Sequence, residues 1–448
     1  MKYYSRNDLI FLAVICLIHS VYFGLAWHYK HIFNGDSFEY IYEAINIRDY
    51  NFFYSGNPAL PIEEEYKTLR TPGYPLFLLL VYSFVVNNWI VLFLQNLVSI
   101  FNIMMARHTL KAAGYCERLD KLLLMFIILF PSQFIYANTI APDILLQTFC
   151  LVYFSHAIAF LKTGSVKNML GMAVAITVGL FIKPVLYPLA IIHCIAFLIY
   201  TFIQHRRLTK SAVTAFIPIL IVCFYCFWNQ QRTGKFHFTS IQSFNAIYYY
   251  NNYLKSTKGT NEARNFLTVE RSAIAALPSL KERYDYAQSR GLDLLKGENV
   301  SYLAFHLKRS AEFFVETGKG EMDLFLGNNT LGKLYADDTR GLKSILKESG
   351  VPGLTKHLIE YPTGFFAILV LCANLVRLGG FVLFFVFNRQ RAIINWFIGL
   401  YVVYFAAITG PISNAHYVLP ISLILMGCAS IGLSRLLTVK NNRPIITQ

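Results

Sequence analysis

Long apolar runs constrain this chain more than any other feature of its sequence. Runs of about 17 to 25 apolar residues are long enough to cross a bilayer as helices. With 55% hydrophobic and only 15% charged residues, the chain is also too apolar for an ordinary soluble protein. We therefore predict an all-α polytopic membrane protein. The ten predicted spans lie near residues 9–27, 90–106, 121–139, 143–161, 168–183, 185–203, 212–230, 363–386, 393–410 and 417–436.

The net charge of +15 would suggest a nucleic-acid partner if the protein were soluble. Here the lysines and arginines gather in short clusters between the apolar runs, which is the pattern of cytoplasmic loops. We interpret the charge as a topology signal and predict membrane lipids, not nucleic acid, around the chain.

One further apolar run, 73–86, has only about 14 residues and begins with "TPGYPLF". If it does not cross, every basic cluster falls on one side of the membrane, whereas a full crossing would move the later clusters outside. We predict a re-entrant or interfacial piece, broken by Pro72 and Pro75, and both termini in the cytoplasm. The predicted cytoplasmic segments contain Lys2 and Arg6, residues 107–121, 162–167, 204–210 and 389–391, and Lys440 with Arg443.

This topology divides the chain into three parts. Residues 1–230 form a transmembrane module whose first external loop is 28–72, and residues 362–448 form the C-terminal spans. Between them, 231–361 is predicted to be an external, mainly α-helical domain. Its sequence has amphipathic stretches but carries no metal-ligand spacing, repeat or glycine-rich phosphate loop.

Local features within the spans have simple explanations. Seven of the eight cysteines lie in apolar runs, so Cys223 and Cys226 are more readily explained as packing residues than as a redox pair. The first run is followed by the bulky sequence "AWHYKHIF", which predicts an uncleaved span and not a removable signal peptide.

An acidic helix is predicted at 36–47, directly after the first span. Asp36 can be explained as its N-cap, with Glu39 completing a capping box. Alternatively, Asp36 is a catalytic carboxylate. The predicted apolar stripe comprises Phe38, Ile41, Tyr42 and Ile45, and the opposite face carries Asp36, Glu39 and Glu43.

Four other polar residues are predicted at the same outer membrane level as Asp36. Each has a local explanation. Asp143 favours a helix N-terminus, Lys183 can extend to lipid headgroups, Arg70 is an interfacial anchor, and His416 is a hydrogen-bonded interfacial histidine.

Together these residues make a chemically coherent set. Arg70 and Lys183 can hold a lipid-linked phosphate and stabilise the charge that grows on it as a sugar leaves. Asp36 can take the proton of the attacking hydroxyl or amine, and direct attack inverts the sugar configuration. The pattern predicts glycosyl transfer from a lipid phosphate.

At these residues the membrane part resembles the GT-C superfamily of polyprenyl-phosphate-sugar-dependent glycosyltransferases, especially bacterial relatives of protein O-mannosyltransferases and of the lipid A aminoarabinose transferase. The resemblance rests on an acidic residue after the first span in "GDSFEY", a basic residue before a proline-rich piece in "LRTPGYPLFLLL", and the basic-proline pair in "IKPVLYP".

The resemblance implies a fold of seven spans, with amphipathic helices in the first external loop, then a variable external domain and further spans. It implies Asp36 as the base or a metal-adjacent carboxylate and Asp143 as a second acidic candidate. Glu39, Arg70, Lys183, His416 and Tyr417 are the predicted substrate-binding residues. Many relatives have Arg-Tyr where this chain has His416-Tyr417. Members of the family differ in their need for a divalent cation, so the resemblance does not decide whether this chain needs one.

We therefore expect an inverting transferase that moves a sugar from a polyprenyl phosphate to a lipid, glycan or protein acceptor on the outer face of the cytoplasmic membrane. A flippase for lipid-linked glycans is the alternative, but ionisable residues are sparse within the spans. The other alternative is an O-antigen-type polymerase. Its candidate arginines in the external domain are Arg264, Arg271, Arg283, Arg290 and Arg309.

Overall fold

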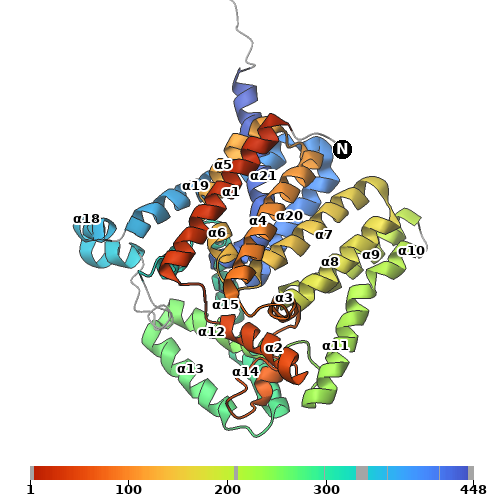
Figure 1. Ribbon diagram of the computed structural model, residues 1–448, viewed down its shortest axis with the longest axis vertical. Helices are drawn as coiled ribbons and strands as arrows, with labels where there is room; N and C mark the ends of the chain where they lie inside the picture. Colours follow the sequence, from red (N-terminus) through yellow and green to blue (C-terminus); the bar gives the residue numbers. More distant parts are fainter. Residues whose placement is uncertain are drawn as a thin grey trace, which may run out of the picture.

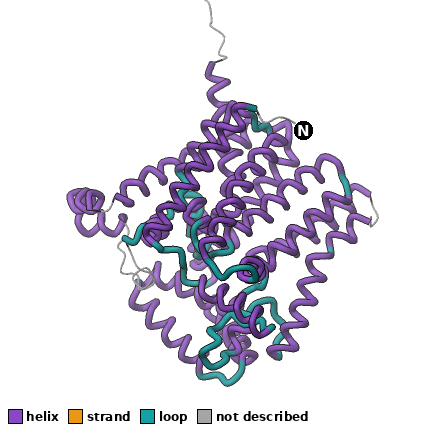
Figure 2. The backbone as a smooth tube through the Cα atoms, in the orientation of Figure 1, coloured by secondary structure: helices purple, strands orange, loops and turns teal. Residues whose placement is uncertain are grey.

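The computed structural model describes residues 5–205, 210–296, 298–328, 342–360, 362–412 and 414–441, and each regular element among them is a helix (Figures 1 and 2). This confirms the predicted all-α class. The N-terminal half contains α1 (Arg6–Tyr29), α2 (Ser37–Tyr50), η1 (Glu64–Lys67), α3 (Gly73–Tyr82), α4 (Asn88–Leu110), η2 (Lys111–Ala113), η3 (Glu117–Leu119), α5 (Asp120–Ile128), α6 (Ser132–Ala137), α7 (Asp143–Thr163), α8 (Val166–Ile182), η4 (Pro184–Leu186), α9 (Tyr187–His205), α10 (Lys210–Ala215) and α11 (Ile217–Thr233). The second half contains α12 (Ile241–Lys258), α13 (Thr260–Ala275), α14 (Leu280–Lys296), α15 (Asn299–Glu312), α16 (Lys319–Phe325), α18 (Leu342–Glu360), α19 (Pro362–Phe387), η5 (Arg389–Arg391), α20 (Ala392–Thr409) and α21 (Ala415–Asn441).

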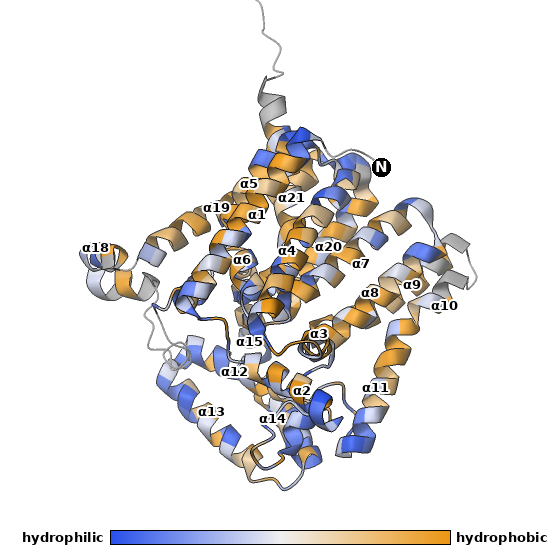
Figure 3. Cartoon of the chain, viewed as in Figure 1, coloured by the Kyte–Doolittle hydropathy of each residue, from blue (hydrophilic) through white to orange (hydrophobic). Residues whose placement is uncertain are grey.

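Seven helical stretches in the described chain are long and apolar enough to cross a membrane. The chain is therefore a multi-pass membrane protein, and its apolar helices stand out from the polar α13 in Figure 3. The seven stretches are Arg6–Tyr29, Asn88–Ala113, Asp143–Thr163, Val213–Thr233, Pro362–Phe387, Ala392–Thr409 and Ala415–Leu436. Two of the ten predicted spans, 168–183 and 185–203, correspond to the shorter apolar helices Val166–Ile182 and Pro184–Tyr200.

The predicted span at 121–139 is wrong as a single helix, because it breaks into α5 and α6. Pro131 stands at the break, where it has no N–H to donate and disfavours helical backbone in the residue before it. Side chains of α4 satisfy carbonyls beyond the break. Gln95 donates to the carbonyl of Thr139 at 2.8 Å, and Asn96 donates to that of Ala137 at 3.1 Å. Such pairing allows irregular backbone inside an apolar bundle.

The short run at 73–86 forms the ten-residue helix α3. At 1.5 Å per residue α3 is about 15 Å long, roughly half the thickness of the hydrocarbon core, so it is too short to cross. Gly73 packs so closely on α8 that an added Cβ would lie 2.6 Å from the carbonyl oxygen of Phe181. Close contact with α8 and α2, together with its length, fits the predicted non-crossing piece.

The predicted orientation of α2 is wrong. Its buried face contains Tyr40, Glu43, Ala44 and Ile47, whereas Phe38 on the predicted apolar stripe is 46% exposed. The ring of Tyr40 packs edge-on against Tyr74 of α3, with 5.2 Å between ring centroids. Contact with α3 therefore decides which face of α2 is buried, and it buries an acidic residue.

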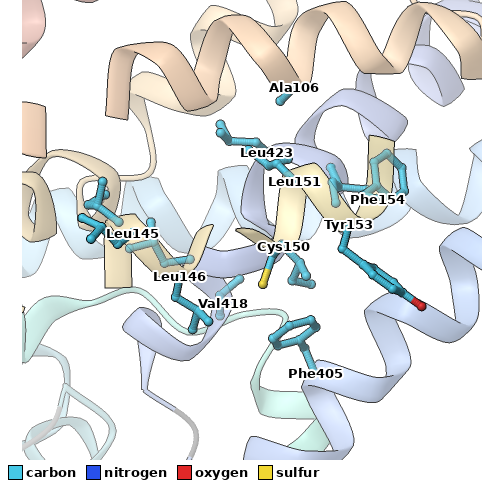
Figure 4. Packing of buried hydrophobic residues seen from close by; sticks show 14 of the residues in the cluster. Ala106, Leu145, Leu146, Cys150, Leu151, Tyr153, Phe154, Phe405, Val418 and Leu423 are labelled. Carbon is cyan, nitrogen blue, oxygen red and sulfur yellow. The ribbon is translucent and has the colours of Figure 1, made fainter. Parts of the chain in front are cut away.

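The core joins helices that are far apart in the sequence. Figure 4 shows Cys150 of α7 beside Phe405 of α20 and Val418 of α21. The buried hydroxyl of Tyr401 donates to the carbonyl of Cys150 at 3.1 Å, which fixes α20 against α7. All eight cysteines are free thiols.

The two ends of the bundle differ in composition. The start of α1 and the end of α21 lie at the top of Figure 1, whereas α2 and the polar helices α12 to α15 lie at the bottom. The residues discussed below therefore gather at the end opposite the termini. Which side is cytoplasmic, and the domain boundaries at 230 and 361, stay predictions.

Candidate functional site

The start of α2 leaves the Asp36 carboxylate available for contacts outside its own helix. Asp36 occupies the N-cap position, but its side chain makes no capping hydrogen bond within the described chain. The preceding turn is held instead by Asn34 and Ser37, because Asn34 Oδ1 accepts from the Asp36 N–H at 3.1 Å and from the Ser37 hydroxyl at 2.9 Å. The Ser37 hydroxyl also lies 2.7 Å from the carbonyl of Ile140. The predicted capping box is therefore wrong.

Arg70 forms ion pairs with both acidic residues at the start of α2. Its Nη2 lies 2.8 Å from Asp36 Oδ1, and it also binds Glu39. The guanidinium lies over the ring of Tyr40, 5.3 Å from the centroid. Burial raises the pKa of Glu39, and the charge of Arg70 opposes this shift. Asp36 is the more accessible carboxylate, because its side chain is 53% exposed and that of Glu39 is 25% exposed.

Lys183 and Asp143 form the second ion pair, with 2.8 Å between Nζ and Oδ1. Lys183 is followed by Pro184, which disfavours helical backbone at Lys183, and α8 accordingly ends in an extended conformation there. Asp143 begins α7 and its side chain is only 3% exposed. The Lys183 ammonium also lies 5.1 Å from the ring centroid of Tyr417. Because so buried a carboxylate would be costly without a cation, the pair stabilises both charges.

The two ion pairs lie near one side chain, Tyr40. Burial raises the pKa of Tyr40, Arg70 and Lys183 lower it, and Asp36 and Asp143 raise it further. All four charges therefore act on the same phenol. The structure thus brings together four of the residues that the sequence assigned to one membrane level.

A cavity of about 760 Å³ adjoins this cluster. Of the predicted site residues, Asp36 and His416 line it, and Glu39, Arg70, Asp143, Lys183 and Tyr417 are not among its lining residues. The complete lining comprises Asn34, Gly35, Asp36, Tyr136, Asn251, Asn252, Lys255, Ser256, Phe305, Arg309, Glu316, Gly318, Gly320, Glu321, Leu324, Ile412, Asn414, Ala415 and His416.

His416 contacts an acidic residue that sequence reasoning missed. Its Nδ1 lies 3.5 Å from Glu321 Oε1, and its backbone N–H donates to the same oxygen at 3.3 Å. Its ring lies 4.0 Å from that of Tyr417 and 5.5 Å from that of Tyr136, between centroids.

Glu316 and Glu321 belong to the predicted external domain, about a hundred residues before His416 in the chain. Gly318 begins α16 between them with a φ of +68°, a conformation that glycine adopts at little cost. Two isolated glutamates in a stretch without a motif gave no signal of a site, because they reach the cavity through the packing of α16 against α6, α19 and the start of α21.

The carboxylates near α2 are engaged by cations in a way that does not suit a metal ion. Within the described ranges, no group of three or more His, Cys, Asp or Glu residues is arranged to hold one. Asp36 is paired with Arg70, and Asp143 with Lys183. We derive no step through a metal.

The arginines of the polymerase alternative are dispersed. Only Arg309 lines the large cavity, where it binds Glu312 and donates to the carbonyl of Ile412 at 3.0 Å. Arg271 and Arg283 line a separate cavity of about 270 Å³. Arg290 pairs with Glu270 at 2.8 Å, and Arg264 lines neither cavity.

No protein-family model matches the chain, and no curated protein matches it. Among solved structures, the crystal structure of ArnT from Cupriavidus metallidurans bound to undecaprenyl phosphate is similar, with a TM-score of 0.39 and 14% sequence identity. The match covers 95% of this chain and 78% of that chain.

Proposed function

We propose that this chain is a membrane glycosyltransferase that moves a sugar from a polyprenyl phosphate to an acceptor at the outer face of the cytoplasmic membrane. One observation carries the proposal: the half-exposed carboxylate of Asp36 lines a cavity of about 760 Å³ and lies 2.8 Å from the guanidinium of Arg70, at the end opposite the termini. A base next to phosphate-binding cations is what glycosyl transfer from a lipid phosphate requires.

The proposed step is a direct displacement. The acceptor oxygen or nitrogen attacks the anomeric carbon, and the bond from that carbon to the phosphate oxygen breaks with its electron pair leaving on the phosphate. Asp36 takes the acceptor proton. Because attack and departure occur on opposite faces, the sugar configuration inverts.

Arg70 and Lys183 are the proposed partners of the phosphate. Arg70 is planar and can offer two parallel N–H groups to phosphate oxygens, whereas Lys183 acts as a point charge. Both are already paired with carboxylates, so a bound phosphate would share or displace those partners. Asp143 is 3% exposed and holds Lys183, which favours a positioning role for it over direct contact with substrate.

Glu39, His416 and Tyr417 complete the proposed substrate-binding set. Glu39 shares Arg70 with Asp36 and so helps to orient the guanidinium. His416 reaches the cavity, while Tyr417 lies beside Lys183. We expect His416 to contact substrate and Tyr417 to act through the lysine.

The test is transfer by Asp36→Asn in proteoliposomes supplied with labelled polyprenyl-linked sugars and envelope lipids of the source organism. We expect loss of transfer by about 100-fold or more, the lower range for removal of a general base. Asp49→Asn is the matched control, because Asp49 lies on the same helix, pairs with its neighbour Arg48 and is absent from the cavity lining. Equal activity of Asp36→Asn and Asp49→Asn would refute the assignment.

Arg70→Ala tests the donor side of the proposal. It should raise the KM for the donor more than it changes the KM for the acceptor, because the guanidinium is assigned to the phosphate. Equal effects on both KM values would leave Arg70 as a structural anchor of α2.

A further inference from the structure

The large cavity has two walls of different origin. Asp36, Tyr136 and His416 belong to the membrane module and the last span, whereas the opposite wall comes from α12, α15 and α16. The candidate base therefore shares this cavity with residues of α12, α15 and α16. A molecule in the cavity would contact both walls.

The lining is rich in hydrogen-bond acceptors, and its lysine and arginine, Lys255 and Arg309, both have interactions within the chain. Three carboxylates face the cavity, those of Asp36, Glu316 and Glu321. Arg309 is engaged by Glu312 and a backbone carbonyl. A phosphorylated ligand would face these three carboxylates, whereas hydroxyl and amine groups would find acceptors.

Two acceptor oxygens in this lining have no hydrogen-bond partner among the described residues: Asn251 Oδ1 and Glu321 Oε2. A buried acceptor without a donor costs about 1–3 kcal/mol, so each is a place where a ligand donor would be stabilising. Both atoms are recessed in the wall. They can reach a ligand because the terminal torsions of Asn and Glu are soft.

Further groups in the same wall suit a sugar ring. Asn252 and Asn414 add amides, and the rings of Tyr136 and Phe305 add apolar surface. Glu316 Oε1 accepts from the backbone N–H groups of Thr317 and Gly318, at 3.1 and 3.3 Å, so its orientation is set before a ligand binds. The volume of about 760 Å³ lies within the range of ordinary ligand pockets.

We propose that this cavity binds the saccharide portion of the acceptor, a ring bearing hydroxyl or amine groups without phosphate, with Glu321 and Asn251 accepting its hydrogen bonds. This inference rests on the proposed function, because only a transferase has an acceptor to which the bound saccharide could belong. The chemistry of the ligand follows from the lining alone. Glu321 is a binding residue here and takes no proton in the transfer step.

The experiment measures binding without any donor. The full-length chain in lipid nanodiscs is illuminated with diazirine-bearing glucosamine and glucose, and labelled peptides are mapped by mass spectrometry. We expect labels within residues 251–256 and 316–321, removed by excess unmodified sugar. Asn251→Leu and Glu321→Gln should each lower labelling by about tenfold, the equivalent of one charge-assisted or buried hydrogen bond.

The control is Glu282→Gln, which changes an exposed glutamate on α14 that does not line the cavity and should label like the parent. If Glu321→Gln does not fold, Asn251→Leu carries the test. No labelling of the parent, or labelling of both cavity variants at the level of the parent, would overturn the inference.

Further arms separate this inference from its alternatives and from the proposed function. Stronger labelling of the same peptides by sugar 1-phosphate probes would assign the cavity to the donor and overturn the acceptor assignment. In a transfer assay, Glu321→Gln should raise acceptor KM and leave donor KM unchanged. Transfer by the parent with acceptor KM unchanged in Glu321→Gln would overturn the inference and leave the transferase function standing. Sugar binding by the parent without transfer would overturn the transferase function and leave the sugar-binding cavity standing.

Discussion

Glu43 is the most strongly perturbed carboxylate of α2, and its replacement by glutamine has a calculable effect. The side chain is 4% exposed, and its Oε2 has no hydrogen-bond partner in the described part of the chain. Burial raises the pKa of Glu43 from 4.5 to about 8, although the charges of Arg232 and Arg70 act in the opposite direction. Glu43 is therefore protonated in the folded protein at neutral pH.

The magnitude follows from the difference in pKa between the folded and unfolded states. A rise from 4.5 to about 8 corresponds to roughly 5 kcal/mol. Because the folded-state pKa is the higher one, the stability associated with protonation is fully present below pH 4.5. It is lost as pH rises to about 8, since the unfolded chain releases its proton first. Glutamine cannot ionise, so Glu43→Gln escapes this loss.

The assay is thermal unfolding of the full-length chain in detergent between pH 5 and pH 9. The unfolding midpoint of Glu43→Gln minus that of the parent should be roughly 4 °C larger at pH 9 than at pH 5, given the entropy of unfolding expected for a chain of this length. Glu282→Gln, on an exposed part of α14, should follow the parent at every pH. A difference that is constant with pH, or one that favours glutamate at pH 9, would refute the reasoning.

Two further substitutions test the packing of the membrane module. The side chain of Arg107 is 5% exposed and binds Asp120 at 2.7 Å and Asp8 at 2.5 Å. Arg107→Ala should therefore cost about 3–5 kcal/mol of stability and lower the unfolding midpoint. An unchanged midpoint would contradict a stabilising role for these ion pairs. A Cβ at Gly432 of α21 would lie 2.0 Å from a carbonyl oxygen of α19, so Gly432→Ala should separate the two helices and cost about 1–3 kcal/mol. Gly379→Ala on α19, where a Cβ meets nothing within 4 Å, should be tolerated, and equal destabilisation by both would argue against the close contact.

The sequence predicts the helical class and the shared location of the charged residues because both depend on hydropathy and on the order of the spans. Arg70 meets Asp36, and Lys183 meets Asp143, at one end of the bundle. The direct pairing itself could not be predicted, since it depends on the turn before α2 and on the proline after Lys183.

Other features were missed for identifiable reasons. Pro131 was a visible signal that the helix at 121–139 would break, but a prediction from hydropathy alone does not include the effect of proline on the backbone. The buried face of α2 could not be found from its own apolar pattern, because Tyr40 packs on α3 and carries Glu43 inside with it. Glu316 and Glu321 enter the cavity through contacts between distant segments, and no local pattern reports such contacts.

Cleavage of the bond between a sugar and a lipid phosphate can be measured directly. Proteoliposomes containing only this protein are given polyprenyl-phosphate-linked sugar and acceptor lipid, and the lipids are separated after incubation. We expect free polyprenyl phosphate and glycosylated acceptor in equal amounts, with inverted anomeric configuration and no product from Asp36→Asn. Intact lipid-linked sugar carried across the bilayer, with no polyprenyl phosphate released, would refute the transferase function and indicate a flippase.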